Sequence, residues 1–228
     1  MRIRHIKNAE ELVDSHPLVI TEPEKFKGNW RKEVFGNDNP LYLEIGTGMG
    51  TFIRESATAN PDVNYVGLEM NSTVLLKSIR RYEGMVREEE GPDPEDDAPV
   101  LRNLRFIRCD ARLICDFFDK SEVDRIYLNF SDPWPKDKNA NKRLTSPMFL
   151  KRYREILREA AEVEFKTDNR GLFDYSVETA KNEGWKLNTV TYDLHGDPVL
   201  SKGNIMTEYE SKFSAKGNLI NKMVITAE

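Results

Sequence analysis

The stretch LYLEIGTGMGTF, residues 41–52, joins an apolar run to a helical pattern through three alternate glycines. Gly46, Gly48 and Gly50 tolerate a positive φ, and the missing Cβ lets a ligand approach the backbone closely. A strand that enters such a turn and a helix that leaves it are typical of α/β proteins that bind nucleotide-like ligands. The motif alone is weak evidence, because glycines also mark ordinary βα turns.

Outward from this stretch, short β-rich runs alternate with helical patterns along the chain. The predicted strands cover 41–45, 64–69, 104–109, 125–130, 162–167, 186–194 and part of 219–227; the predicted helices cover 49–59, 71–87, 110–119, 146–160 and 170–183. This alternation predicts a mostly parallel seven-stranded sheet with helices on both faces. Only TEYESKFSAKG, residues 207–217, separates the last two strands, so we expect one antiparallel edge strand.

The length of 228 residues fits one α/β domain. We expect residues 1–39 to form an N-terminal extension and residues 40–228 to form the domain with the glycine loop. EEEGPDPEDDAP, residues 88–99, holds seven acids and no base, which predicts a solvated, mobile loop. Without this loop the formal net charge of −5 becomes positive, so the overall balance does not exclude a nucleic-acid partner.

The composition excludes several classes of protein. No apolar run is long enough to span a bilayer, and MRIRHIKNAEEL at the N-terminus lacks the apolar core of a secretory signal. A zinc site needs more ligands than two cysteines and three scattered histidines supply, so we expect no metal. These features predict a cytoplasmic protein with reduced cysteines.

Two carboxylates lie close to the glycine loop. Glu44 ends the first predicted strand, and Glu69 ends the second, 19 residues after Gly50. A carboxylate at this edge of the sheet can accept hydrogen bonds from a ribose. The pyrophosphate of NAD needs a helix N-terminus without nearby negative charge, whereas Glu44 suits a cationic amino-acid tail. The sequence therefore favours S-adenosylmethionine, which carries an ammonium and a sulfonium but no phosphate.

Two further strand ends carry acids. Asp110 in RCDAR follows the third predicted strand, where it is either an acceptor for the adenine amino group or a helix N-cap. SDPWP, residues 131–135, follows the fourth, and its prolines give a stiff loop that presents Asp132 and Trp134. The alternative is a rigid surface turn around a core tryptophan. Trp134 either stacks on a base or wedges under the loop.

EIGTGMG, VGLEM, CDA, NFSDPWPK, FKTDN and TEYESKFSAKG follow one another along the chain. In this order they resemble the motifs of the bacterial tRNA (guanine-N7-)-methyltransferase family, from about residue 20 to the end. The resemblance implies a class I Rossmann-like methyltransferase, a monomer or homodimer. It also implies methylation of N7 of guanine at position 46, in the variable loop of tRNA.

The resemblance assigns residues as well. It implies that Glu44, Glu69, Asp110 and Asp132 line the cofactor pocket, together with the three glycines. It places the substrate against a second set, which comprises Lys136, Asp168, Thr207, Glu208, Tyr209 and Glu210. We expect Asp132 to be the catalytic residue, because a carboxylate near the guanine edge stabilises the positive charge that methylation creates.

Basic residues follow the SDPWP loop in KDKNANKR, residues 136–143, and KRYR, residues 151–154. They would supply the phosphate contacts that dominate affinity for RNA, and Lys138, Lys142 and Arg143 are the predicted contacts. Asn139 and Asn141 stand where the family has a denser basic stretch, and a solvated face is the alternative. The cluster Lys25, Lys27, Arg31 and Lys32 in the extension either contacts tRNA or belongs to a loosely ordered terminus.

Three other functions compete with this interpretation. A methyltransferase for a protein or small molecule is disfavoured by the basic stretch and the TEYE segment. A non-catalytic RNA-binding module is disfavoured by the four intact carboxylates of the predicted cofactor pocket. An NAD-binding oxidoreductase is disfavoured by Glu44 beside the glycines and by the absence of a second domain.

Overall fold

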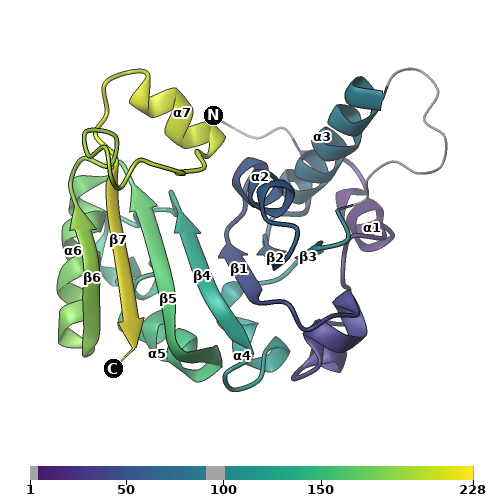
Figure 1. The fold of residues 1–228 in the computed structure, drawn as a ribbon, viewed down its shortest axis with the longest axis horizontal. Helices are drawn as coiled ribbons and strands as arrows, with labels where there is room; N and C mark the ends of the chain where they lie inside the picture. The colour runs from purple at the N-terminus through teal and green to yellow at the C-terminus, as the bar shows by residue number, and fades with distance from the viewer. Residues whose placement is uncertain (1–4, 91–100, 228) are drawn as a thin grey trace.

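The computed structural model describes residues 5–90 and 101–227, and Figure 1 shows their arrangement. Seven strands form one sheet in the order β3-β2-β1-β4-β5-β7-β6. The strands are β1 (Leu41–Ile45), β2 (Asn64–Leu68), β3 (Leu104–Ile107), β4 (Val123–Asn129), β5 (Leu157–Thr167), β6 (Trp185–Thr191) and β7 (Asn221–Ala227). The predicted α/β fold with a mostly parallel seven-stranded sheet is confirmed.

Antiparallel pairing at one end of the sheet is also confirmed, with one refinement. The reversed strand is β7, and it lies second from the edge, between β5 and β6. The chain between β6 and β7 stays at the carboxyl end of the sheet, where Figure 1 shows α7 (Glu208–Ser214). β7 therefore starts where β6 ends and must run in the opposite direction.

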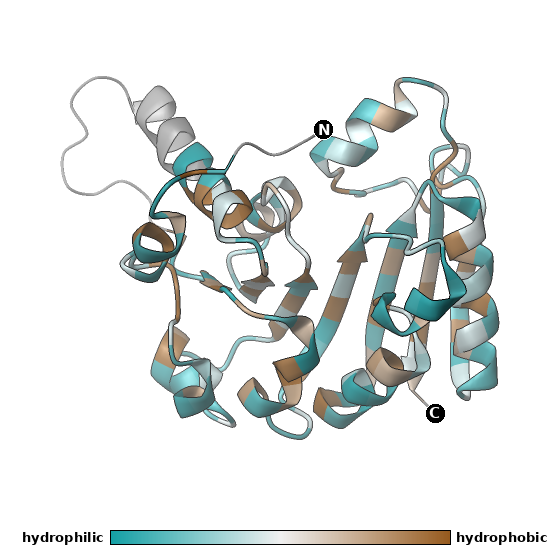
Figure 2. Ribbon diagram, turned by 180° about the vertical axis from the view of Figure 1, so that it is seen from behind, coloured by the Kyte–Doolittle hydropathy of each residue, from teal (hydrophilic) through white to brown (hydrophobic). Residues whose placement is uncertain are grey.

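Helices cover both faces of the sheet. α4 (Ile114–Phe117), α5 (Pro147–Ile156) and α6 (Arg170–Asn182) pack on one face, over the larger apolar core. α1 (Ala9–Asp14), α2 (Thr51–Ala59) and α3 (Ser72–Glu90) pack on the other, over a second core. In Figure 2, hydrophobic and hydrophilic bands follow one another along the central strands. Successive side chains of a strand point to opposite faces of the sheet.

Three predicted boundaries differ from the structure. The helix predicted for 146–160 ends at Ile156, because the helix-favouring residues after it join β5, where Leu157 pairs with Val123. α3 continues to Glu90, so residues 88–90 are helical, and the rest of the predicted acidic loop lies outside the described residues. The helix predicted for 110–119 is split into η3 (Ala111–Leu113) and α4.

The N-terminal residues pack into both cores, α1 into the second and Trp30 into the larger. They form α1, η1 (Pro23–Phe26) and η2 (Trp30–Phe35), and Trp30 is buried with its ring stacked 5.1 Å from that of Phe118. The Glu122 carboxylate accepts hydrogen bonds from the backbone N–H groups of Gly28 and Trp30. These contacts anchor the extension at the amino ends of the strands.

None of the helices in the described ranges has the length and apolar character needed to cross a membrane. Within the same ranges, no three histidine, cysteine, aspartate or glutamate side chains gather closely enough to hold a metal ion.

Candidate active site

The glycine loop lies at the carboxyl edge of the sheet, between β1 and α2. The N–H groups of Gly46 and Thr47 donate to the carbonyl of Leu68 at the end of β2, which anchors the loop. The Glu69 carboxylate accepts a hydrogen bond from Gly48 N at 3.1 Å and one from Asn71 N at 2.8 Å. Glu69 therefore braces the loop and keeps oxygen lone pairs for a ligand.

The three glycines have the predicted positive φ but serve different purposes. Gly46, Gly48 and Gly50 have φ values of 80°, 55° and 71°. A Cβ added to Gly46 or Gly48 would meet nothing within 4 Å, so these two keep space open above the backbone. A Cβ on Gly50 would lie 2.0 Å from Ser78 Oγ, so this glycine lets α2 pack against α3.

Below the loop, the buried carboxylate of Glu44 has one oxygen without a hydrogen-bond partner among the described residues. It is 1% exposed, and its Oε1 accepts a hydrogen bond from Asn129 Nδ2 at 2.8 Å. Four buried side-chain oxygens, on β1, on β4, in the glycine loop and at the start of α2, have no hydrogen-bond partner among the described residues: Glu44 Oε2, Asn129 Oδ1, Thr47 Oγ1 and Thr51 Oγ1. β1 and β4 are neighbouring strands and the glycine loop follows β1 directly, so acceptors for an ammonium and hydroxyl donors for a carboxylate lie on adjoining segments, which fits the amino-acid end of S-adenosylmethionine.

The charge state of Glu44 depends on what binds there. Burial raises the pKa of this carboxyl to about 8, although the Asn129 hydrogen bond and the charge of Lys166 oppose the shift. Without a ligand the carboxyl is therefore mostly protonated at neutral pH. A bound cation favours the ionised form.

Asp110 caps η3, so the N-cap interpretation is confirmed. Its Oδ1 accepts a hydrogen bond from Arg112 N at 2.9 Å, and its carboxylate also pairs with the Arg112 guanidinium. Hydrogen bonds from that guanidinium hold the pKa of Asp110 below its usual value. The contact to an adenine amino group stays a prediction.

A cavity of about 340 Å³ opens beside Asp110, at the carboxyl end of β3. Its walls come from two strand ends and from the extension, and include Met70, Ile107, Cys109, Asp110, Ile20, Thr21, Pro23 and Glu24. The cavity lies where the sequence predicts the adenine ring. The wall formed by the extension has no local sequence signal, because it depends on backbone hydrogen bonds of Leu18 and Ile20 to Phe106.

The SDPWP loop presents Asp132 to solvent at the end of β4. Asp132 is exposed and makes no hydrogen bond or ion pair within residues 5–90 and 101–227. Its charge acts on Glu69, whose pKa is raised mainly by burial and to a smaller extent by Asp132. The two carboxylates therefore flank the same space.

Arg143 supports this loop from below. It is buried; its Nε donates to the carbonyl of Pro133 and its terminal nitrogen to that of Trp134, each at 3.1 Å. The guanidinium also lies 4.2 Å from the centre of the Tyr175 ring. In this structure Arg143 holds the loop, and its contact to RNA stays a prediction.

The TEYE segment starts α7, and its residues separate into two groups. Thr207 and Glu210 form a capping box, and Glu210 is fully buried. Glu208 forms an exposed ion pair with Arg81 of α3, and the half-exposed Tyr209 ring lies 5.1 Å from that of Phe130. Of the four predicted substrate contacts, Glu208 and Tyr209 are thus the accessible ones.

A protein-family model described as "Putative methyltransferase" matches residues 38–223 of this chain. The tRNA (guanine-N(7)-)-methyltransferase of Lachnoclostridium phytofermentans is 49% identical over 228 residues, which cover 100% of this chain and 99% of that protein. The enzymes of that name from Listeria monocytogenes serotype 4b and Bacillus velezensis are 46% and 44% identical, over 95% and 96% of this chain and 94% of each relative.

This chain belongs to the tRNA (guanine-N(7)-)-methyltransferase family. The resemblance predicted from the six motifs is therefore confirmed. Solved structures support the fold. The 16S rRNA methyltransferase KamB aligns with a TM-score of 0.61 at 13% identity, covering 88% of this chain and 93% of that one. A SAM-dependent methyltransferase from Aquifex aeolicus aligns with a TM-score of 0.53 at 12% identity, covering 97% of both chains.

The remaining predicted tRNA contacts of this family member lie at both ends of the sheet. Lys136, Lys138 and Lys142 are exposed on and beside η4 (Asp137–Lys142), and the Lys142 ammonium lies 4.6 Å from the centre of the Trp134 ring. Trp134 is therefore covered on one face by a lysine of the predicted RNA surface. Arg31 of the second basic cluster pairs with Asp124 at the amino end of β4, away from this site.

Lys166 lies at the end of β5 and Asp168 directly follows this strand, near α7. Asp168 accepts a hydrogen bond from Asn218 Nδ2 at 2.9 Å. Lys166 is fully buried and paired with Glu210, and no prediction included it. The signal was present in EVEFKT, where charged residues alternate at 162, 164 and 166 along a strand that lies inside the sheet.

Without cofactor, the gain in stability of Glu44→Gln over the wild type should be larger at pH 8 than at pH 5. Between pH 4.5 and about 8 the unfolded chain has lost the Glu44 proton and the folded protein keeps it, so wild-type stability falls as pH rises. The slope is at most about 1.4 kcal/mol per pH unit. Thermal unfolding without cofactor at several pH values measures it. A difference in melting temperature between variant and wild type that stays constant from pH 5 to 8 would contradict this charge assignment.

Proposed function

We propose that this chain transfers a methyl group from S-adenosylmethionine to N7 of guanine 46 in the variable loop of tRNA, in the cytoplasm. The observation that carries the proposal is a pair of carboxylates on neighbouring strand ends. Glu44 is buried and half-satisfied below the open glycine loop, and Asp132 is exposed and unpaired among the described residues. The family to which the chain belongs supports the reaction.

The residues fit the cofactor along its length. Glu44, Thr47, Thr51 and Asn129 would hold its amino-acid end, Glu69 its ribose, and the cavity beside Asp110 its adenine. When bound, S-adenosylmethionine supplies an electrophilic methyl group on a sulfonium. We assign this pocket to residues 40–228, with residues 1–39 as an extension that adds a wall to it.

The chemistry of guanine N7 explains the need for a carboxylate. N7 has an in-plane lone pair and no proton, so no base is required to create the nucleophile. Methylation leaves positive charge on the purine, and a carboxylate within hydrogen-bond reach of N1–H and N2–H stabilises that charge. Two observations support Asp132 in this role: Arg143 holds its loop, and among the described residues the carboxylate has no hydrogen-bond or ion-pair partner.

The tRNA would lie across the carboxyl edge of the sheet. Lys136, Lys138 and Lys142 offer cations to phosphates on one side of Asp132. Asp168 and the exposed Glu208 and Tyr209 border the site from the direction of α7. Trp134 lies beside the lysines, under Lys142.

Binding of tRNA should weaken steeply as salt rises from about 50 to 200 mM, because lysine–phosphate contacts release counterions. Lys138→Ala should lower the slope of log affinity against log salt by about one. Lys186 is an exposed lysine on the edge strand β6, so Lys186→Ala is the control and should leave the slope unchanged. Fluorescence anisotropy with a tRNA transcript gives both slopes. An affinity that is flat over this range would count against the proposed surface.

Nucleoside mass spectrometry of tRNA from a deletion strain tests the function. We expect 7-methylguanosine to disappear and to return when the gene is restored. Methylation in vitro of a transcript with guanine at position 46, but not of one with adenine there, tests the position. A deletion strain that keeps its 7-methylguanosine would instead favour a methyltransferase for another substrate.

A further inference from the structure

Lys166 is a buried cation whose donors are all used by one segment. Its side chain is 0% exposed at the end of β5. The ammonium donates to Glu210 Oε2 at 2.7 Å, to the carbonyl of Ile205 at 2.9 Å and to Asn204 Oδ1 at 3.0 Å. An ammonium has three N–H donors, so this set satisfies it completely. All three acceptors belong to the chain that leads into and starts α7.

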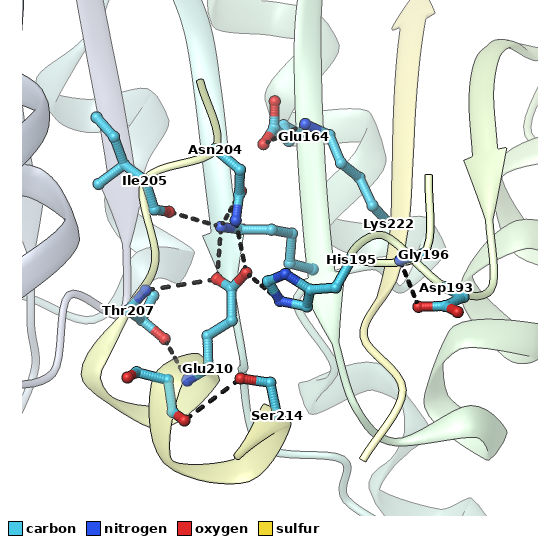
Figure 3. A network of polar contacts seen from close by, with 12 residues as sticks. Glu164, Asp193, His195, Gly196, Asn204, Ile205, Thr207, Glu210, Ser214 and Lys222 are labelled. Atoms are coloured by element: carbon cyan, nitrogen blue, oxygen red, sulfur yellow. Dashed lines mark hydrogen bonds and ion pairs between the residues drawn. The ribbon is translucent and has the colours of Figure 1, made fainter. Parts of the chain in front are cut away.

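Glu210 completes the network, which Figure 3 shows around its carboxylate. Its Oε1 accepts a hydrogen bond from Asn204 Nδ2 at 2.7 Å and lies 3.2 Å from His195 Nε2. Its Oε2 also accepts from Thr207 N, and Glu210 N donates to Thr207 Oγ1, which closes the capping box. One buried ion pair thus fixes both the start of α7 and the loop before it.

The same lysine touches the cofactor side of the site. Its ammonium lies 5.2 Å from the centre of the Phe52 ring, in the first turn of α2 after the glycine loop. Lys166 pairs in the sheet with Asn129, which donates to Glu44. Its carbonyl accepts a hydrogen bond from Phe130 N, directly before the SDPWP loop. Lys166 therefore contacts three elements: the one beside the predicted cofactor pocket, the one that leads into the Asp132 loop and the one that carries the TEYE segment.

We propose that Lys166 is a positioning residue for methyl transfer: through Glu210 it fixes Thr207–Tyr209 relative to the glycine loop and Asp132, and so orients the tRNA. The inference rests on the proposed function. Packing alone does not call for this pair, because apolar side chains of similar volume are often as stable as a buried ion pair. A fixed geometry between two binding sites does call for it, since misplacement by a small distance slows a reaction strongly.

The test compares Lys166→Met with Lys222→Met. Lys222 lies directly opposite Lys166 in the β5–β7 ladder and pairs with Glu164 at 3.0 Å, and it forms no hydrogen bond or ion pair with residues 204–210 (Figure 3). Both substitutions thus break an ion pair on the same face of the sheet, but only one loosens α7. Active enzyme is counted by calorimetric titration with S-adenosylmethionine, so that a misfolded fraction does not enter the rate constants.

Per cofactor-binding site, Lys166→Met should lower kcat/KM for tRNA by about 100-fold, with part of the loss in kcat at saturating tRNA. Affinity for S-adenosylmethionine should fall by less than about tenfold in the same variant, since the Lys166 charge only assists ionisation of Glu44 and the main loss lies in orientation. Lys222→Met should leave both constants unchanged. Glu210→Gln should resemble Lys166→Met, and the double variant should be no worse than either single one, because the two residues act as a unit.

If Lys166→Met does not fold, the double variant replaces it in the same assays, since removal of both charges costs less than removal of one. Unchanged tRNA kinetics in a folded Lys166→Met or double variant would overturn the proposal. Hydrogen–deuterium exchange of residues 204–214 gives a readout without tRNA. We expect faster exchange there in Lys166→Met than in Lys222→Met, and equal exchange would also overturn it. Failure of the wild type to methylate tRNA would instead refute the proposed function.

Discussion

Replacement of Asp132 by asparagine should lower the rate of methyl transfer to tRNA by about 10³-fold. The side chain keeps its shape, so the loss would come from the missing negative charge beside the guanine. The substitution should leave the stability of the fold unchanged, because Asp132 is exposed and its carboxylate has no hydrogen-bond or ion-pair partner among the described residues. Single-turnover methylation of a tRNA transcript measures the rate of the chemical step.

Asp137→Asn is the matched control. Asp137 is an exposed acid five residues further along, in η4, and its replacement makes the same change in net charge. We expect its rate to stay within about threefold of wild type, as for an ordinary surface substitution. Affinity for S-adenosylmethionine should fall by less than tenfold in Asp132→Asn, because Glu44 and Glu69 remain. A variant that keeps near-wild-type turnover would remove Asp132 from the mechanism.

The fold was predictable because its signals are local. An apolar run before the glycines predicts β1 with the bounds that the structure has, Leu41–Ile45. The same signals failed where pairing partners overrule local preference. The residues after Ile156 favour a helix, yet they extend β5, because β4 offers a backbone to pair with.

The sequence was enough to predict the acidic residues of the candidate site, but not the basic residues that hold its loops. Glu44, Glu69 and Asp132 are recognisable because each carries charge at a strand end, next to residues that fix the loop. Arg143 acts through two backbone carbonyls of the preceding loop, and Lys166 acts through a carboxylate far along the chain; the spacing of residues reveals neither contact. From the sequence alone, a basic residue near a predicted RNA surface is therefore interpreted as a phosphate contact, even when its side chain is buried. The unpartnered oxygens of Glu44, Thr47, Thr51 and Asn129 also emerge only once the chain is folded and these side chains are buried.

Glu44→Gln should weaken binding of S-adenosylmethionine by up to about 100-fold, the effect of losing a hydrogen bond to a charged group of about 1.5–3 kcal/mol. The loss should depend on pH in a defined direction. Below pH 8 the wild type must release the Glu44 proton before it can pair with the cationic tail, so wild-type affinity rises with pH, by at most about tenfold per unit. The variant lacks this step, so the difference between the two proteins should be larger at pH 8 than at pH 6.

Calorimetry distinguishes this linkage from a general loss of binding. In buffers of different ionisation enthalpy at pH 7, the wild type should release close to one proton per cofactor bound, and Glu44→Gln should release none. Glu164→Gln is the control, since Glu164 is also buried but forms its ion pairs with Lys222 and Arg125 away from the glycine loop. Equal proton release by wild type and Glu44→Gln would mean that the buried carboxyl is not the group that meets the cation. Release by the wild type alone would tie the burial of Glu44 directly to cofactor choice, because a phosphate-bearing dinucleotide would gain nothing from an acid that ionises on binding.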